Sequence, residues 1–360
     1  MRIYQVLSTI AYGDAVSNDT IAMGKIIKEM GYTTGIYAES IVPPLDKKTV
    51  VGIDKLNDVQ KDDIIIFHMS TGSRLNFDVA KYNCRKIVVY HNITPPEYFK
   101  NCDERFARIC EYGLEGAEYL ADKVDYCLAV SEFNKQDLIN MGYKCDIDVL
   151  PIIIPMSDYD KKPDRGVIKE YSDGYTNILF TGRVAPNKKH EDLIASFYYY
   201  NRLYNKKSRL ILAGSYKDND PYYIRLTEYT KKLGLGDAIV FTGHIKFNQL
   251  LAYYKTADIF LCMSEHEGFC VPLVEAMKFH VPVIAYDKAA VADTMGHKGM
   301  IINDKDPVYV AGCIDRVVKD KNLRHQIIEW QDERLKSFEY ESIAKQFKQY
   351  LTAFIKKSSI

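Results

Sequence analysis

The feature of this sequence that most restricts its fold is a repeated alternation of short apolar runs with longer amphipathic stretches. The runs at 63–69 and 86–91 are continuously apolar, as in strands that are buried on both faces of a parallel sheet. Parallel strands need crossover connections, which are usually helices. The first such helix is expected to begin near Thr20, with Ser17 or Asn18 as its cap, after a polar loop. The alternation predicts an α/β protein.

The alternation stops once and then starts again. Residues 155–176 are polar, contain two prolines and show no strand pattern. A chain of 360 residues also exceeds one comfortable hydrophobic core. We therefore expect two doubly wound, parallel-sheet (Rossmann-like) domains that face a central cleft, at 1–158 and 176–337, joined by a linker at 159–175.

Composition argues against several classes of partner. Lysine plus arginine equals aspartate plus glutamate, at 48 each, so no net charge favours nucleic acid. The eight cysteines form no C-x-x-C pair and no zinc-ligand spacing. The N-terminal apolar run is too short for a secretory signal, and no segment reaches the roughly 18 apolar residues of a membrane span. We expect a cytoplasmic protein with reduced thiols, no metal and no other cofactor.

Doubly wound domains bind ligands beyond the carboxyl ends of their strands, so loops that directly follow strands are the candidate sites. The loop after the predicted strand at 177–181 holds Gly182, Arg183 and Lys188, and a helix follows it. Two cations beside a helix N-terminus form an anion site. A solvated basic turn is the alternative interpretation. No P-loop sequence is present.

A second strand-end loop carries two glutamates, Glu267 and Glu275. In one continuous helix they would be about 12 Å apart along the axis. A turn before a helix that begins near Pro272 lets both reach one extended ligand. The free amides between them belong to Gly268, Phe269, Cys270 and Val271. Carboxylates accept well from neighbouring hydroxyls, so the two loops together predict a sugar-nucleotide site; taken alone, the glutamates could be a solvated turn and an ordinary helix.

At this point the sequence resembles a known family. EGFCVPLVEAM is similar to the E-x₇-E signature of retaining glycosyltransferases of family 4 (glycosyltransferase group 1), and FTGRVAPNKKHEDLI resembles their diphosphate loop. FTGHI at 241–245 resembles their nucleobase-side loop. YGDAVSNDT, FHMSTGS, VVYHNITPPEYF and VDYCLAVSEFNKQDL are similar to one bacterial branch. The resemblance covers nearly the whole chain and implies the GT-B fold, with a C-terminal helix at about 338–360 that packs back on the first domain.

The resemblance also implies catalytic roles. Arg183 and Lys188 would hold the donor diphosphate and stabilise its charge as the glycosidic bond breaks, which needs no metal. Glu267 would contact the transferred sugar, and Glu275 the ribose. His91 would contact the donor sugar or the positive charge that develops on it, and the alternative is a structural histidine.

Further residues complete the predicted site. The donor side would include Gly13, Gly182, His244 and Ile245. A structural role is the alternative for His244. The acceptor side would consist of Asp14, His68, Ser70 and Gly72. Asp14 can also be explained as a turn residue.

The resemblance implies a retaining, metal-independent glycosyltransferase. It would move a sugar from a UDP- or GDP-sugar to a hydroxyl of a glycan or lipid-linked acceptor, in the synthesis of a bacterial surface polysaccharide such as O-antigen or capsule. Two alternatives are a GT-B sugar-nucleotide 2-epimerase and a non-catalytic sugar-nucleotide-binding protein. The basic segment at 345–359 leaves open a peripheral contact with the inner face of the cytoplasmic membrane. The sequence does not choose between a monomer and a homodimer.

Overall fold

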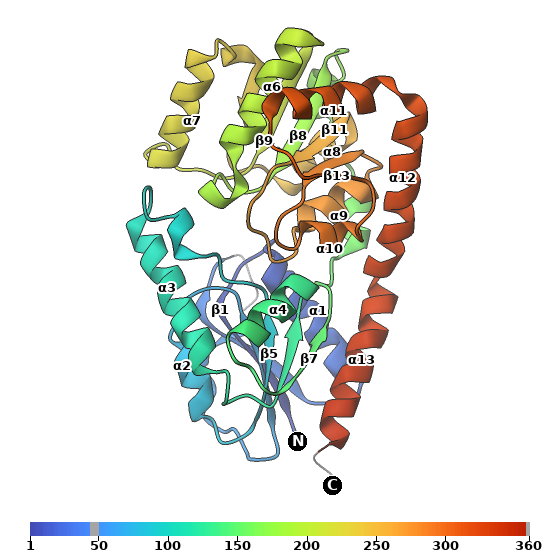
Figure 1. The fold of residues 1–360 in the computed structure, drawn as a ribbon. Coiled ribbons are helices and arrows are strands. Elements are labelled where there is room, and N and C mark those ends of the chain that lie inside the picture. Colours follow the sequence, from blue (N-terminus) through green and yellow to red (C-terminus); the bar gives the residue numbers. More distant parts are fainter. Residues whose placement is uncertain (44–49, 358–360) are drawn as a thin grey trace. The chain divides into compact units, whose positions relative to one another are not determined.

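The computed structural model describes residues 1–43 and 50–357, and these form two compact units (Figure 1). Unit 1 contains Met1–Lys100, Glu104–Pro155 and the chain from Ser337 onward. Unit 2 contains Asn101–Asp103 and Met156–Lys336. Each unit has one sheet, and the strand pairs described in both sheets are parallel. The predicted α/β class with two parallel-sheet, Rossmann-like domains is confirmed.

Unit 1 has a seven-stranded sheet in the order β3-β2-β1-β4-β5-β6-β7. Its strands are β1 (Ile3–Ile10), β2 (Thr34–Ile41), β3 (Val50–Gly52), β4 (Ile64–Met69), β5 (Arg85–Tyr90), β6 (Tyr126–Ala129) and β7 (Asp146–Val149). Its α-helices are α1 (Ala15–Glu29), α2 (Leu75–Asp78), α3 (Glu104–Tyr119), α4 (Glu132–Asn140) and α13 (Tyr340–Lys356). The strand order reverses between β1 and β4, and the crevice beyond such a reversal is where doubly wound sheets bind ligands.

Unit 2 has a six-stranded sheet in the order β10-β9-β8-β11-β12-β13. Its strands are β8 (Thr176–Thr181), β9 (Ser208–Ala213), β10 (Ile239–Phe241), β11 (Ile259–Cys262), β12 (Val283–Tyr286) and β13 (Met300–Ile302). Its α-helices are α5 (Arg165–Tyr171), α6 (His190–Leu203), α7 (Pro221–Lys232), α8 (Phe247–Thr256), α9 (Val271–Lys278), α10 (Val291–Met295), α11 (Pro307–Lys319) and α12 (Lys321–Leu335). Here the order reverses between β8 and β11.

Helix α1 begins earlier than the sequence predicted. Its N-cap is Asp14, whose Oδ2 accepts a hydrogen bond from the Ser17 amide at 3.0 Å. Short polar residues favour helix caps as much as loops, so a cap was mistaken for the middle of a loop. The correction places Asp19 on the second turn of α1, where its side chain is completely buried.

The segment 159–175, expected to be a linker, is instead part of unit 2. It contains the end of a 3₁₀ helix, η4 (Met156–Asp160), and the whole of helix α5. Asp164 caps α5 by accepting from the amides of Gly166 and Val167. Val167 and Tyr171, four residues apart on one face, are buried. Their spacing is helical, but the charged residues between them hide it in the sequence.

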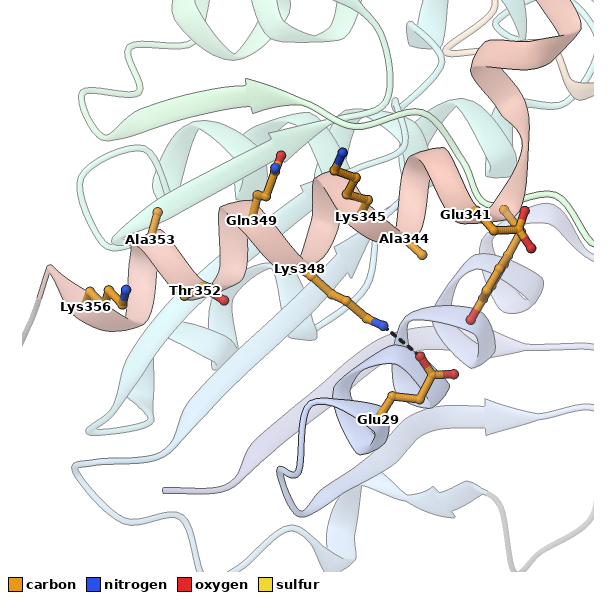
Figure 2. Close-up of a pocket in the computed structure, with 10 residues that line it drawn as sticks. Glu29, Glu341, Ala344, Lys345, Lys348, Gln349, Thr352, Ala353 and Lys356 are labelled. Atoms are coloured by element: carbon orange, nitrogen blue, oxygen red, sulfur yellow. Dashed lines mark hydrogen bonds and ion pairs between the residues drawn. The ribbon is translucent and has the colours of Figure 1, made fainter.

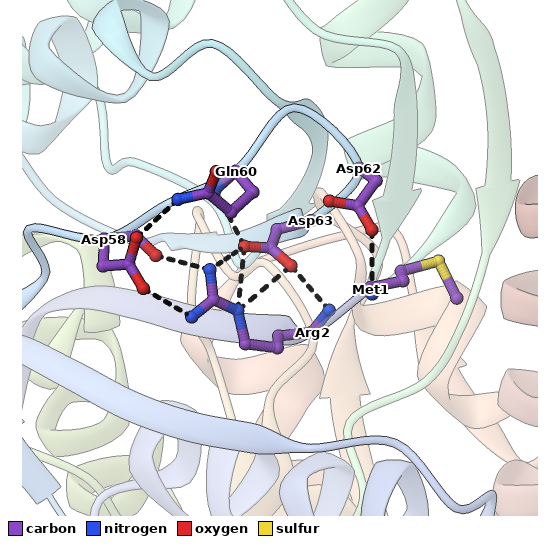
Figure 3. Close-up of polar contacts among 6 residues, drawn as sticks. All are labelled: Met1, Arg2, Asp58, Gln60, Asp62 and Asp63. Atoms are coloured by element: carbon purple, nitrogen blue, oxygen red, sulfur yellow. Dashed lines mark hydrogen bonds and ion pairs between the residues drawn. The ribbon is translucent and has the colours of Figure 1, made fainter.

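A cluster of charges ties the amino ends of β1 and β4 together (Figure 3). The Arg2 guanidinium donates to Asp63, with 2.6 Å between Nη2 and Oδ2, and to Asp58 at 2.9 Å. The terminal amine of Met1 pairs with Asp62 at 2.9 Å. Asp63 is buried, and a buried carboxylate needs such partners. These contacts hold β1 beside β4, the two strands at which the order reverses.

Helix α13 packs on unit 1 through one apolar face. Ile343, Phe347, Leu351 and Phe354 recur at intervals of three or four residues and are buried. On its outer side, Figure 2 shows Lys348 reaching Glu29 of α1, with 2.9 Å between Nζ and Oε2. This side forms an open groove of about 800 Å³. Among the helices described, none is both long enough and apolar enough to cross a membrane.

Candidate functional site

The two predicted loops of unit 2 leave adjacent strands. β8 pairs with β11, and their carboxyl ends lead into residues 182–189 and 263–270 respectively. The first of these loops ends in a 3₁₀ helix, η5 (Pro186–Lys188), which directly precedes α6. The reversal of strand order therefore brings together loops that are about 80 residues apart in the sequence. This is the position at which doubly wound sheets bind their ligands.

Lys188 and Glu267 contact each other there. The distance between Lys188 Nζ and Glu267 Oε2 is 2.5 Å, and Glu267 is only 7 % exposed. Burial is the largest single influence and lowers the pKa of Lys188, but the charge and hydrogen bond of Glu267, together with the nearby thiols of Cys270 and Cys262, raise it more in sum, so the pKa of Lys188 is raised. The structure thus places the cation predicted for phosphate beside the carboxylate predicted for the sugar. Arg183 lies on the exposed part of the same loop, directly after Gly182.

The sequence analysis missed the residues that hold these loops together. Asn187 is 5 % exposed, and its side-chain Nδ2 donates to the backbone carbonyl of His266 at 3.0 Å. The backbone carbonyl of Asn187 accepts from the backbone amide of Glu265 at 2.9 Å. Lys305 Nζ bonds Glu265 Oε1 at 2.9 Å. Asn187 stands next to Lys188 in the sequence, yet only the strand order reveals that its partners lie on the other loop.

Glu275 is buried in the fifth position of α9, away from the exposed loop surface. Its Oε1 accepts from the Tyr159 hydroxyl and its Oε2 from the Tyr254 hydroxyl, both at 2.6 Å. Burial raises the pKa of Glu275, while the two phenols act in the opposite direction. Tyr254 also contacts Thr181 Oγ1 at 2.7 Å, at the end of β8. Each carboxylate oxygen can accept two hydrogen bonds, so each of these oxygens could accept one more.

The turn between the two glutamates has a fixed shape. Cys270 is the N-cap of α9 and has a φ of 69°, which is unusual for a residue with a side chain. Phe269 is buried, and its carbonyl accepts from the Thr294 hydroxyl. Gly268 and Val271 are partly exposed. Strained backbone of this kind persists where the surroundings hold it, and here Thr294 of α10 does so.

The predicted nucleobase-side loop lies elsewhere on the sheet. His244 is exposed and Ile245 partly exposed, in the loop after β10, which is the edge strand two places from β8. Gly243 has a φ of 68°, and its Cα faces the Tyr216 ring of the loop after β9. Tyr216 stacks on Tyr223 with 3.8 Å between ring centroids. Aromatic side chains therefore lie beside this loop, and the sequence analysis did not predict them as part of the site.

In unit 1, the loop after β1 contains Gly13, whose φ of 79° favours glycine. Asp14 is the cap of α1, which agrees with the turn interpretation. Ser70 is partly exposed directly after β4. Gly72 permits close packing instead of facing an open site, because a Cβ there would lie 1.9 Å from the Ile109 carbonyl oxygen of α3.

His68 does not have the open position expected of an acceptor-binding residue. Its side chain is completely buried at the end of β4. Nδ1 is 3.1 Å from His91 Nε2, and Nε2 is 3.0 Å from Gln5 Oε1. Both ring nitrogens therefore already have protein partners, so the expectation for His68 is corrected. His91, directly after β5, is buried as well.

Comparison with known proteins finds a family model that is similar to most of unit 2. Residues 163–334 match the family described as glycosyl transferases group 1. An uncharacterized glycosyltransferase of Methanocaldococcus jannaschii is 30 % identical over 153 residues, 42 % of this chain and 38 % of that protein. The O-antigen chain mannosyltransferase B of Escherichia coli is 25 % identical over 250 residues, 67 % of this chain and 63 % of that protein. The chain thus spans less than two thirds of the length of these curated relatives. Unit 2 is thus similar to the group 1 glycosyltransferases.

Solved structures extend the comparison to the fold of the whole chain. The Anabaena protein HepE, solved in complex with UDP-glucose, aligns with a TM-score of 0.76 at 15 % identity and covers 98 % of this chain and 100 % of its own. This likeness establishes the fold, which is that of the GT-B glycosyltransferases.

Proposed function

We propose that this protein, whose residues 163–334 match the group 1 glycosyltransferases, transfers a sugar from a nucleotide-diphosphate sugar to a hydroxyl of a glycan or lipid-linked acceptor. The observation that carries the proposal is the Lys188–Glu267 contact at the strand reversal of unit 2, beside Gly182 and Arg183. A cation and a carboxylate held together, next to further backbone amides, suit a ligand that has both phosphates and hydroxyls.

In the proposed reaction, Arg183 and Lys188 bind the donor diphosphate. Negative charge grows on that group as the glycosidic bond breaks, and fixed cations stabilise it without reorganising. Glu267 accepts hydrogen bonds from the sugar that is transferred and orients its anomeric carbon. Glu275, held by Tyr159 and Tyr254, accepts from the ribose hydroxyls.

We further propose that transfer retains the anomeric configuration and needs no metal ion. The acceptor hydroxyl would approach on the face from which the diphosphate departs. The leaving phosphate would take the acceptor proton. The name of the Escherichia coli relative contains "O-antigen chain mannosyltransferase", which supports a bacterial surface polysaccharide as the product. Such an acceptor would be met at the cytoplasmic face of the membrane.

A nucleotide panel tests the donor class. Thermal unfolding is measured with UDP, GDP, ADP and TDP, and we expect UDP or GDP to stabilise the protein. A ligand at 100 times its Kd adds roughly 2.7 kcal/mol of stability. No shift with any nucleotide contradicts the proposal.

The variant Lys188→Ala tests the chemistry. Because Lys188 supplies charge in the transition state, its loss should lower the transfer rate at least tenfold while the fold remains. Lys232→Ala, in the exposed last turn of α7, is the matched control and should transfer at the wild-type rate. A near-normal rate for Lys188→Ala would show that Lys188 does not stabilise the charge of the diphosphate.

An assay without acceptor tests the epimerase alternative. Product formed from the donor alone indicates an epimerase instead.

A further inference from the structure

Four polar side chains meet in the interior of unit 1, at its strand reversal. Gln5 lies in β1, His68 in β4, His91 directly after β5, and Asp19 on α1. Leu7, two residues after Gln5, pairs with His68 across the sheet. His68 pairs in turn with Val89, two residues before His91. Side chains alternate between the faces of a sheet, so Gln5, His68 and His91 emerge on the same face.

The contacts among them have a direction. Gln5 Oε1, at 3.0 Å from His68 Nε2, is a carbonyl oxygen and can only accept, so His68 Nε2 carries the hydrogen. A neutral imidazole has one N–H, so His68 Nδ1 accepts. The hydrogen between the two rings, whose nitrogens are 3.1 Å apart, therefore belongs to His91 Nε2.

Both rings are held neutral by their surroundings. Burial lowers the pKa of His68 well below its ordinary value and that of His91 to about 3. With the hydrogen on Nε2 of His91, the Nδ1 of the same ring carries a lone pair and can only accept a hydrogen bond. This nitrogen is buried and has no hydrogen-bond partner among the residues that the structure describes. A buried acceptor without a partner is rare in folded proteins, and it fits a group that meets a ligand.

Asp19 also lies close to His91 Nε2. Its Oδ1 accepts from the Ile153 amide at 2.8 Å, which fixes the carboxylate in place. Its Oδ2 lies 3.7 Å from His91 Nε2 and has no hydrogen-bond partner among the described residues. Burial raises the pKa of Asp19 to about 7, so the ionised form predominates at pH 7.5, and a negative oxygen this close then favours a hydrogen on Nε2 over one on Nδ1. Asp19 and His68 thus favour the same tautomer of His91.

We propose that Asp19, His68 and Gln5 are positioning residues that hold His91 with its hydrogen on Nε2, and so present Nδ1 as the acceptor for a sugar hydroxyl. This inference rests on the proposed glycosyltransferase function. The hydroxyl belongs to the donor sugar or to the acceptor glycan, and the two share the same chemistry. Neither Asp19 nor Gln5 touches the substrate: Asp19 acts on His91 directly, and Gln5 acts on it through His68.

The tautomer can be measured directly in the wild-type protein. Imidazole ¹⁵N chemical shifts of ¹⁵N-histidine-labelled protein distinguish a protonated from an unprotonated ring nitrogen. His91→Gln assigns the signals by the loss of one set. We expect His91 to have a protonated Nε2 and an unprotonated Nδ1 at pH 7.5. The opposite tautomer overturns the inference, whether or not any transfer activity has been found.

Asp19→Asn then tests whether Asp19 sets this state. An asparagine amide can donate to His91 Nε2, which moves the hydrogen to Nδ1 and removes the acceptor. We expect the ¹⁵N shifts to report that change, and kcat or kcat/KM to fall at least tenfold. If the KM for the donor rises, the hydroxyl bound by His91 belongs to the donor sugar. If the KM for the acceptor rises, that hydroxyl belongs to the acceptor glycan.

Asp63→Asn is the matched control, because Asp63 is a second buried aspartate of unit 1 that pairs with Arg2 at the far ends of the strands. It should lower stability without altering the His91 tautomer or KM. If Asp19→Asn changes only stability, as this control does, the positioning role is wrong. If no donor supports transfer by the wild type, the proposed function fails while the tautomer measurement still stands.

Discussion

His190, the first residue of α6, shows how one side chain can determine a response to pH. Its imidazole is completely buried against the rings of Phe180 and Tyr222. Burial, aided by the charge of Lys188, lowers the pKa of His190 to about 3. The unfolded chain exposes the ring and protonates it near pH 6.5. Between these values the unfolded state binds more protons, so stability is lost as the pH falls through that window.

His190→Phe should therefore reduce the pH dependence of stability. Phenylalanine keeps the edge-to-face contacts and has no proton to bind. Each fully titrating group contributes about 1.4 kcal/mol per pH unit, so the variant should lose about 1 kcal/mol less than the wild type between pH 6 and pH 5. Urea unfolding at the two pH values measures the difference. His325→Gln, on the exposed surface of α12, should behave as the wild type. Equal slopes for His190→Phe and the wild type would contradict the assignment.

At the scale of elements, the candidate site depends on how closely β8 and β9 approach where they end. The Gly182 amide donates to the Ala213 carbonyl at 2.9 Å and continues the ladder past β8. Gly214 follows β9, and a Cβ there would lie 1.9 Å from the Gly182 carbonyl oxygen. That contact is with backbone, which cannot move aside as a flexible side chain can. Gly214 is needed here because the backbones themselves are in contact, whereas at Gly182 it is the φ of 150° that favours glycine.

Gly214→Ala should therefore displace the loop that carries Arg183 and Lys188. We expect lower thermal stability and at least a tenfold weaker binding of the nucleotide that stabilises the wild type. Gly236→Ala is the control, because nothing lies within 4 Å of a Cβ at that position. It should leave both measurements unchanged. Wild-type nucleotide binding by Gly214→Ala would show that the loop tolerates the shift.

At the scale of the whole molecule, the two units are not two consecutive halves of the sequence. The chain from Ser337 onward belongs with the first half of the sequence, not with the helices that precede it. α13 packs against α1. The guanidinium carbon Cζ of Arg85, in β5, lies 3.7 Å from the centroid of the Phe354 ring, and Arg85 Nη2 donates to the backbone carbonyl of Phe354. Unit 1 is therefore completed only by the last part of the chain.

Phe347→Ala and Lys348→Ala, neighbours on α13, separate the contributions of its two sides. Phe347 is completely buried, and its truncation should cost about 3–5 kcal/mol. The Lys348–Glu29 pair is largely exposed and should contribute no more than about 1 kcal/mol. Hydrogen exchange of unit 1 amides, with unit 2 amides as the internal reference, measures both. Similar exchange in the two variants would mean that α13 is not part of the unit 1 core.

The sequence by itself determined the class of the fold and the loops of the candidate site. The periods of strand and helix are local, and loops that follow strands in a parallel sheet lie at the ligand-binding edge, so Lys188 and Glu267 could be identified before the strand order was known. That same locality explains the misplaced start of α1, since one polar segment can be either a loop or a cap.

The tertiary structure alone decided which side chains meet. Strand order joined Asn187 to the loop of Glu267, gave Glu275 its two tyrosines, and buried His68 between Gln5 and His91. The partners in these contacts are between 21 and 116 residues apart. Local periodicity specifies the face on which a residue lies, but the partner across that face depends on the order of the strands and on the helix that covers them.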